Sequence, residues 1–236
     1  MAFMLTAAVS AGQEPAGAVK YTPDFRFRDG IYLNFEQVRE NNPIPKAKIL
    51  TSADYNDREF FKKILSAEKI YFYDEMGIRQ EVAKENIWGF ARNGVIYVMI
   101  QGNYNRITFV GSICHFVADV TTYDTYNYNY YSPYGYYDPY YYSPYSYYGG
   151  YYPYGSYYSP YGRPSTTARN EVKQYLIDFE SGRTMDFNVN SVETLIMRDP
   201  ELYEEFVRLP RSKRKELMFV YVRKFNEKNP LYLPVN

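Results

Sequence analysis

The chain has 236 residues, with 27 Lys and Arg side chains against 27 Asp and Glu side chains, so its formal net charge is zero. A balanced charge gives no long-range field that would draw the whole protein to nucleic acid or to an anionic membrane. Cysteine and histidine each occur once, as Cys114 and His115, which excludes a disulfide within this sequence and does not suffice for a closed zinc site.

The first residues of the chain carry a targeting pattern. Residues 1–11 form a short apolar run that ends in small residues, which is typical of a signal peptide and its cleavage site. A positively charged start is missing, so we interpret residues 1–11 as a truncated signal peptide; the alternative is an apolar N-terminus that packs on the core. The run is about half the ~20 residues that a transmembrane helix needs, so we expect no transmembrane segment. Residues 12–30 then predict a linker that becomes extended.

The next part of the chain is rich in short β patterns. Residues 31–35 alternate apolar and polar side chains, which predicts a half-buried strand. Residues 57–65 place apolar side chains at helical spacing, which predicts a short helix with Asp57 as its N-cap. Asn93-Gly94 lies between apolar flanks and suits both positive-φ positions of a type I′ hairpin. The strands around it predict an antiparallel meander.

The central part of the chain, residues 123–164, consists mostly of tyrosine, proline, glycine and serine. The unit Tyr-Tyr-Ser-Pro-Tyr recurs at 130–134, 141–145 and 157–161. Proline fixes φ and has no backbone N–H, so its recurrence excludes a long helix or a long paired strand. Sheet-like sequence lies on both sides. We therefore expect a low-complexity, irregular insertion in a β domain rather than a tail.

Tyrosine side chains offer large, rigid, amphipathic contact area at low entropic cost, so such a segment is suited to adhere to itself, to sugars or to other proteins. Stacking on nucleic acid would also need cations for the phosphates. The segment has no Lys or Arg before Arg163, so we expect no nucleic-acid partner. The alternative is an insertion without a specific role. The candidate contact surface consists of Tyr130, Tyr131, Tyr134, Tyr141, Tyr142, Tyr145, Tyr157, Tyr158 and Tyr161.

The residues after the insertion predict a hairpin followed by helices. Residues 165–189 contain two segments of alternating apolar side chains about a turn at Ser181-Gly182. Residues 190–236 are amphipathic, with Asp199 as an N-cap and Pro200 at a first helical position. Their apolar stripes must cover a partner, and the predicted sheet is the partner at hand.

These patterns together predict an α+β fold. A mostly antiparallel β-sheet or a partly closed barrel is covered by C-terminal helices packed on it. The β domain comprises residues 31–122 and 165–189, the insertion residues 123–164, and the C-terminal helices residues 190–236.

The sequence contains no motif of a known nucleophile, phosphate-binding loop or metalloprotease. Cys114 and His115 are neighbours on a predicted strand, so their side chains point to opposite faces and do not form a nucleophile–base pair. Asp178, Glu180 and Asp186 lie around one hairpin and are interpreted as solvated acids. We therefore expect no enzymatic activity, no cofactor and no metal.

Two further features have two interpretations each. Trp88, the single tryptophan, is typical of a core residue or of a platform for a ligand such as a sugar ring. Residues 211–215 place four cations at a predicted helix start, where they oppose the helix dipole. They indicate a solvated face, or a contact with an anionic lipid head group or an acidic partner.

Three stretches carry a resemblance to a protein group. "IWGFARNGVIYVMIQGNYNRITFVGSICHFVAD", "YLIDFESGRTMDFN" and "RDPELYEEFVRL…KRKELMFVYVRKFNEKNPLY" are similar to uncharacterised exported proteins of Bacteroidetes-type bacteria. The resemblance covers roughly residues 30–120 and 172–233. It implies a location and no catalytic activity.

The targeting pattern, the lone cysteine and the resemblance predict an exported protein of the periplasm or cell surface, because a bacterial envelope does not demand disulfides. We expect a non-catalytic interaction or structural protein whose Tyr-rich loop mediates self-association or adhesion. Its partner is an unidentified protein or polysaccharide, or a second copy of the chain. The alternatives are a sugar- or peptide-binding module and a carboxylate-based hydrolase of envelope polymers.

Overall fold

The computed structural model describes residues 17–126 and 165–234. The chain divides into two compact units, the first made of residues 1–120 and 172–236 and the second of residues 121–171. The predicted signal peptide and the nine tyrosines of the candidate contact surface lie outside the described residues. The two units are described separately.

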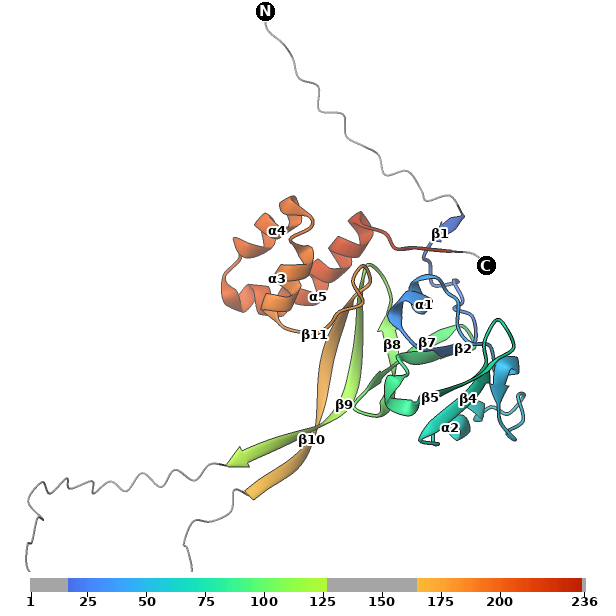
Figure 1. Cartoon of the computed structure of the whole chain (residues 1–236). Helices are drawn as coiled ribbons and strands as arrows, with labels where there is room; N and C mark the ends of the chain where they lie inside the picture. Colours follow the sequence, from blue (N-terminus) through green and yellow to red (C-terminus); the bar gives the residue numbers. More distant parts are fainter. Residues whose placement is uncertain (1–16, 127–164, 235–236) are drawn as a thin grey trace, which may run out of the picture. The chain divides into compact units, whose positions relative to one another are not determined.

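An antiparallel sheet of seven strands organises the fold, in the order β11-β10-β9-β8-β7-β6-β2 (Figure 1). The strands are β2 (Gly30–Tyr32), β6 (Gly89–Arg92), β7 (Val95–Ile100), β8 (Asn103–Phe109), β9 (Ile113–Tyr126), β10 (Ser165–Asp178) and β11 (Thr184–Asp186). The order ends at β11 and β2, which do not pair with each other. The α+β prediction is therefore confirmed with an open sheet, and the partly closed barrel was wrong.

Two tight turns set the register of the meander. Asn93 and Gly94 have φ of 53° and 75°, as a type I′ turn requires, and they join β6 to β7 as predicted. Gln101 and Gly102, with φ of 49° and 80°, join β7 to β8 in the same way. Residues with a side chain rarely adopt these positive φ angles, which is why glycine takes the second position in both turns.

The strand predicted over residues 31–35 is only partly present. β2 ends at Tyr32, and helix α1 (Phe35–Arg39) begins three residues later. The Asn34 side chain accepts a hydrogen bond from the Gln37 backbone N–H at 3.0 Å, while the Gln37 side chain accepts one from the Leu33 N–H at 2.6 Å. This reciprocal pair acts like a capping box, and it outweighs the alternating pattern.

A smaller sheet in the order β3-β4-β5 lies in the same unit. Its strands are β3 (Ile49–Leu50), β4 (Lys69–Tyr73) and β5 (Arg79–Ala83), with 3₁₀ helices at Lys46–Lys48 and Lys84–Asn86. Helix α2 (Phe60–Ile64) confirms the predicted short helix and buries both of its phenylalanines. Its N-cap is Glu59 and not Asp57, because Asp57 instead accepts the Glu59 N–H at 2.7 Å in the preceding turn.

Three helices pack on one face of the main sheet: α3 (Val189–Ile196), α4 (Pro200–Val207) and α5 (Arg211–Lys228) (Figure 1). The predicted cap is present, since Asp199 accepts the Leu202 N–H at 3.0 Å and Pro200 opens α4. The helix side chains form one apolar cluster with Ile113 of β9 and Leu176 of β10. The predicted covering of the sheet by C-terminal helices is confirmed.

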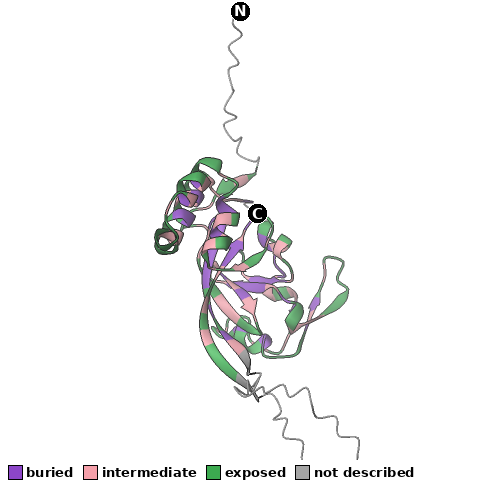
Figure 2. Ribbon diagram, turned by 90° about the vertical axis from the view of Figure 1, so that its left-hand side faces the viewer, coloured by how far each residue is buried: buried purple, intermediate pink, exposed green. Residues whose placement is uncertain are grey.

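Both faces of β10 are buried in its first-unit part. Leu176 joins the cluster under the helices, whereas Ile177 joins a second cluster on the opposite face, and both side chains are 0% exposed. The alternating pattern within residues 165–189 had predicted strands with a single apolar face. Figure 2 shows the buried residues concentrated along the strands and on the inner sides of the helices.

The two ends of the described chain pair with each other. β1 (Ala18–Lys20) lies antiparallel to β12 (Tyr232–Pro234). Leu233 is fully buried in the cluster that also contains Ile177, which we call the main core. Phe27 also belongs to that core. The predicted linker over residues 12–30 therefore contributes a strand and a core residue, and the C-terminal region ends in a strand rather than in helix.

The second unit contains the paired ends of β9 and β10, each of which is 14 residues long. The Thr121 hydroxyl donates to Asn170 Oδ1 at 3.1 Å, and the Thr122 hydroxyl donates to the Arg169 carbonyl at 3.2 Å. Residues 123–126 of the predicted irregular insertion belong to β9, so that part of the prediction was wrong, and the rest of the Tyr-rich insertion connects β9 to β10 along the chain.

Candidate functional site

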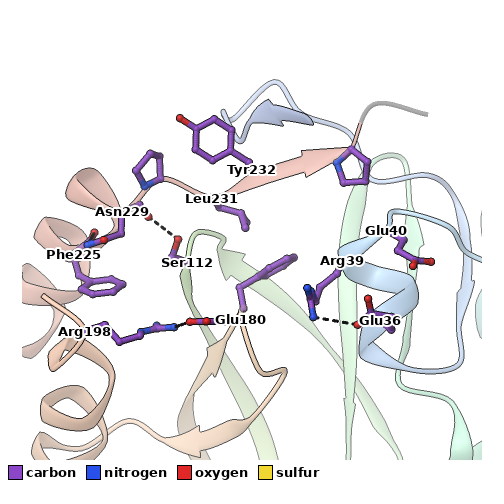
Figure 3. A pocket seen from close by; sticks show the side chains of 13 residues that line it. Glu36, Arg39, Glu40, Ser112, Glu180, Arg198, Phe225, Asn229, Leu231 and Tyr232 are labelled. Atoms are coloured by element: carbon purple, nitrogen blue, oxygen red, sulfur yellow. Dashed lines mark hydrogen bonds and ion pairs between the residues drawn. The ribbon is translucent and has the colours of Figure 1, made fainter. Parts of the chain in front are cut away.

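A cavity of 410 Å³ in the first unit is the candidate site, and we call it the terminal cavity because β12 forms one wall (Figure 3). Six segments converge there: α1, the turn before β9, the β10–β11 turn, the turn between α3 and α4, the end of α5, and β12. The cavity is lined by Glu36, Arg39, Glu40, Ser112, Phe179, Glu180, Arg198, Phe225, Asn229, Pro230, Leu231, Tyr232 and Pro234. Its volume lies within the usual range for small-ligand pockets.

Arg198, which follows α3, has four contacts that restrain its side chain. Its Nη2 lies 2.9 Å from Asp178 Oδ1 and its Nη1 lies 2.5 Å from Glu180 Oε2. Its Nε donates to the Leu195 carbonyl at 3.3 Å, and the guanidinium carbon lies 5.2 Å from the centre of the Phe225 ring. A guanidinium held by two carboxylates and a ring face is rigid, so Arg198 gives the cavity a fixed wall.

These contacts correct the interpretation of the hairpin acids. Asp178 is not solvated but pairs with Arg198, whereas Glu180 pairs with Arg198 and remains 75% exposed, as the prediction of a solvated acid requires. The Asp178 side chain is only 14% exposed and also accepts a hydrogen bond from the Ser181 hydroxyl at 2.6 Å. Asp186 lies on β11, opposite Tyr175, and is not part of the cavity lining.

The end of α5 is fastened to the start of β9. The Asn226 side-chain amide forms hydrogen bonds with both the backbone N–H and the carbonyl of Ile113. The Ser112 hydroxyl donates to the Asn229 carbonyl at 2.6 Å. A Cβ at Gly111 would collide with the Asn226 amide, so glycine is needed for this close approach. The chain that leaves α5 is thereby directed into β12, along the cavity.

The opposite rim of the terminal cavity is charged and open to solvent. Arg39 Nη1 lies 3.2 Å from Glu36 Oε2, and their side chains are 47% and 60% exposed. With the apolar walls from Phe179, Phe225 and Leu231, the cavity combines ion pairs and hydrocarbon surface. This mixture suits a small polar ligand with an apolar face, such as a sugar or a short peptide.

The same geometry bears on the hydrolase alternative, which needs one carboxyl group kept protonated by apolar surroundings. Glu36 and Glu180 are 60% and 75% exposed, and each is paired with an arginine. Glu40 also lines the cavity, and the hydrolase alternative stays a prediction.

Trp88 lies elsewhere and packs against the main core. Its ring centre is 5.5 Å from that of Phe35, and it borders a narrow apolar void next to Cys114. The core interpretation of Trp88 agrees with these contacts. A role as a ligand platform stays a prediction.

Cys114 and His115 occupy opposite faces of β9, as the strand pattern predicted. Burial raises the pKa of the Cys114 thiol to about 12, and its Sγ donates to the Gly111 carbonyl at 3.3 Å. His115 Nε2 lies 2.9 Å from Gln174 Oε1, and its ring packs against Phe187 and Phe219. A thiol that stays protonated is a poor nucleophile, so Cys114 acts as a small core residue.

The four cations at the start of α5 do not form a uniform solvated face. Arg214 pairs with Glu193, and both side chains are less than one quarter exposed, while Lys213 pairs with Glu216 at 2.8 Å. Arg211 and Lys215 line a cavity of 370 Å³ together with Phe187 and Met218. Arg214 is therefore structural, whereas the Lys213–Glu216 pair lies on the surface, with side chains 57% and 63% exposed, so the prediction of a solvated face was partly right.

Within the described residues, no helix is long and apolar enough to span a membrane, and no three His, Cys, Asp or Glu side chains are grouped so that they would hold a metal ion. The chain matches no protein-family model, no curated protein and no solved structure. The conclusions on function accordingly rest on the geometry and the sequence alone.

Proposed function

We propose that the protein is an exported, non-catalytic interaction protein of the cell envelope, in which the Tyr-rich insertion is the contact surface. The favoured partner is a second copy of the chain, and the second arm of the proposal is adhesion to an envelope polysaccharide or protein. The observation that carries the proposal is the attachment of the insertion to β9 and β10, the two 14-residue strands whose ends pair in a unit of their own.

Pairing of the strand ends supports presentation of the insertion as a closed loop. The contacts of Thr121 with Asn170 and of Thr122 with Arg169 hold the two ends of the loop together. Part of the entropy that a contact would cost is thus already lost before a partner binds. A free tail of the same composition would lose more entropy on binding.

The buried clusters of the described residues lie in the first unit. All three buried clusters consist of residues from the first unit, and Val120 is the last residue of β9 that belongs to one. A segment that is uncharged apart from Asp138 between 125 and 162 and rich in tyrosine rings fits a role in contact.

The terminal cavity favours a second candidate function, the binding of a sugar or a short peptide by the β domain. Three observations support this candidate: the cavity volume of 410 Å³, the ion pairs that hold Arg198, and a lining that is partly charged and partly apolar. In this case the insertion has no part in ligand binding. A ligand screen on a chain whose insertion has been replaced by a short Gly/Ser link separates the two candidates.

The proposal is tested with a variant in which the nine tyrosines of the candidate contact surface are changed to serine. This change keeps the length, the prolines and the net charge, and removes only the rings. Light scattering after size-exclusion chromatography should give a larger mass for the native chain than for the variant. Co-sedimentation with purified envelope polysaccharide tests the adhesion arm. Equal mass and equal co-sedimentation of the two chains would refute both arms.

A further inference from the structure

A second cavity of the first unit has a charged lining that is entirely cationic. It measures 290 Å³ and lies between α2 and the strands β6 to β8. Its charged residues are Lys62, Lys84 and Arg92, and we call it the cationic cavity. The other lining residues are Phe61, Leu65, Ser66, Phe90, Gly102, Asn103 and Tyr104.

The cations of this cavity are short of acidic partners among the described residues. Lys84 is half-buried and its ammonium group has no hydrogen-bond or ion-pair partner there. Arg92 is also half-buried; its Nη1 donates to the Arg58 carbonyl at 3.0 Å, and it has no carboxylate partner in the described chain. Lys62 has only Glu59, at 3.5 Å, with both side chains largely exposed.

This arrangement is unfavourable without a ligand. Taking a cation partly out of water costs free energy unless an opposite charge offsets it, and like charges around one cavity repel each other. Across the rest of the described first unit, several surface lysines have a carboxylate within ion-pair distance, for example Lys48 with Glu75 and Lys69 with Glu81. Lys84 and Arg92 lack such a partner although both are half-buried and line the same cavity, and this combination points to an anion that comes from outside the chain.

The floor of the cationic cavity is rigid. The Phe61 and Phe90 rings stack at 4.8 Å, the Phe90 and Tyr97 rings stack at 4.7 Å, and Tyr104 meets Phe90 edge-on at 5.2 Å. The buried Tyr104 hydroxyl has no hydrogen-bond partner in the described structure, so this wall contains one more unsatisfied polar group. A rigid aromatic floor keeps the shape of the cavity constant and lowers the entropic cost of binding.

We propose that the cationic cavity binds the oxyanion group of a small ligand, a phosphate, sulfate or carboxylate. Arg92, held by the Arg58 carbonyl, presents its remaining guanidinium N–H groups in a fixed direction, and Lys84 and Lys62 act as mobile point charges. The volume is at the lower end for ligand pockets, so the site accommodates one anionic group with few further atoms. This inference does not depend on the Tyr-rich insertion.

The test uses the full chain and inorganic phosphate and sulfate as probes, with chloride at equal ionic strength as the reference. Isothermal titration calorimetry should show saturable binding that Lys84→Gln weakens at least about tenfold, since a hydrogen bond to a charged group is lost. Lys215→Gln is the matched control, because it removes one unpartnered cation at a different cavity. It should leave the affinity unchanged.

A second measurement keeps the proposal testable if Lys84→Gln does not fold. Addition of phosphate to the isotope-labelled native chain should shift the backbone amide signals of Lys84, Gly102 and Asn103, and leave those of Arg211 and Lys215 in place. The assignment would be overturned if no saturable binding were found. It would also be overturned if Lys84→Gln and Lys215→Gln weakened phosphate binding equally, or if the signal shifts were spread over all surface cations, because the binding would then be non-specific.

Discussion

Asn226 binds Ile113 through both ends of its side-chain amide. The Ile113 N–H donates to Asn226 Oδ1 at 2.8 Å, and Asn226 Nδ2 donates to the Ile113 carbonyl at 2.8 Å. A side chain of α5 thus occupies the place of a neighbouring strand at the first residue of β9. This contact ties the helical layer to the sheet and sets the path of the chain into β12, along the terminal cavity.

Replacement of Asn226 by alanine should destabilise the protein by about 2 kcal/mol, because two backbone groups of a buried residue lose their partners at once. Urea unfolding followed by circular dichroism measures the change. Asn105→Ala is the control, since the Asn105 amide makes only an exposed contact with the Asn103 carbonyl. It should change the free energy of unfolding by less than about 0.5 kcal/mol. Equal effects would show that the double contact is not important for stability.

Arg198→Met should also cost about 2 kcal/mol, because it leaves the poorly exposed Asp178 carboxylate without its cation. Thermal unfolding at neutral pH, compared with native protein, gives the effect. Arg208→Met serves as the control, since the side chains of the Arg208–Glu204 pair are 77% and 63% exposed and such surface pairs contribute less than about 1 kcal/mol. If both variants unfold at the same temperature, Arg198 is not a structural anchor of the cavity.

The Cys114 thiol should resist alkylation in the folded protein. Its pKa is raised to about 12 by burial, so almost no thiolate is present near neutral pH, and the side chain is only 1% exposed. Mass spectrometry after iodoacetamide treatment should find unmodified protein under native conditions and full modification in guanidinium chloride. Rapid labelling of the native protein would show that the β9 region opens readily.

Stability should fall at alkaline pH in a way that involves Tyr221. Burial, and then the hydrogen bond to Glu205, raises the pKa of Tyr221 from 10.0 to about 12. Because the folded pKa lies above the unfolded value, this contribution is complete below pH 10 and is lost as the pH rises from 10 to 12. Thermal unfolding across that range should show a steeper fall for the native chain than for Tyr221→Phe. Parallel curves would contradict the assignment.

The sequence predicted those parts of the fold whose signals are local. Asn93-Gly94 marked its turn because few other residue pairs adopt two positive φ angles. Asp199-Pro200 marked the start of α4 because capping is a matter of adjacent residues. α1 was missed because the reciprocal contact of Asn34 and Gln37 was hidden in an alternating pattern that favoured a strand.

The remaining features depend on contacts between distant residues. β1 and β12 are three residues each and lie at opposite ends of the described chain, so neither has a periodicity to recognise. The terminal cavity combines Glu36, Ser112, Arg198 and Tyr232, and no spacing in the sequence links them. The cationic cavity is distinguished by half-buried cations without a carboxylate partner. Only a structure reveals which lysine and arginine side chains lack such a partner.

Sedimentation velocity over a concentration series tests the central claim most directly. It compares the intact chain with a chain in which residues 123–164 are replaced by a short Gly/Ser link, after circular dichroism has confirmed that both are folded. If the insertion is a contact surface between copies, the sedimentation coefficient of the intact chain rises with concentration and that of the replaced chain stays constant. If both chains stay monomeric, or if both associate alike, self-association through the Tyr-rich insertion is contradicted.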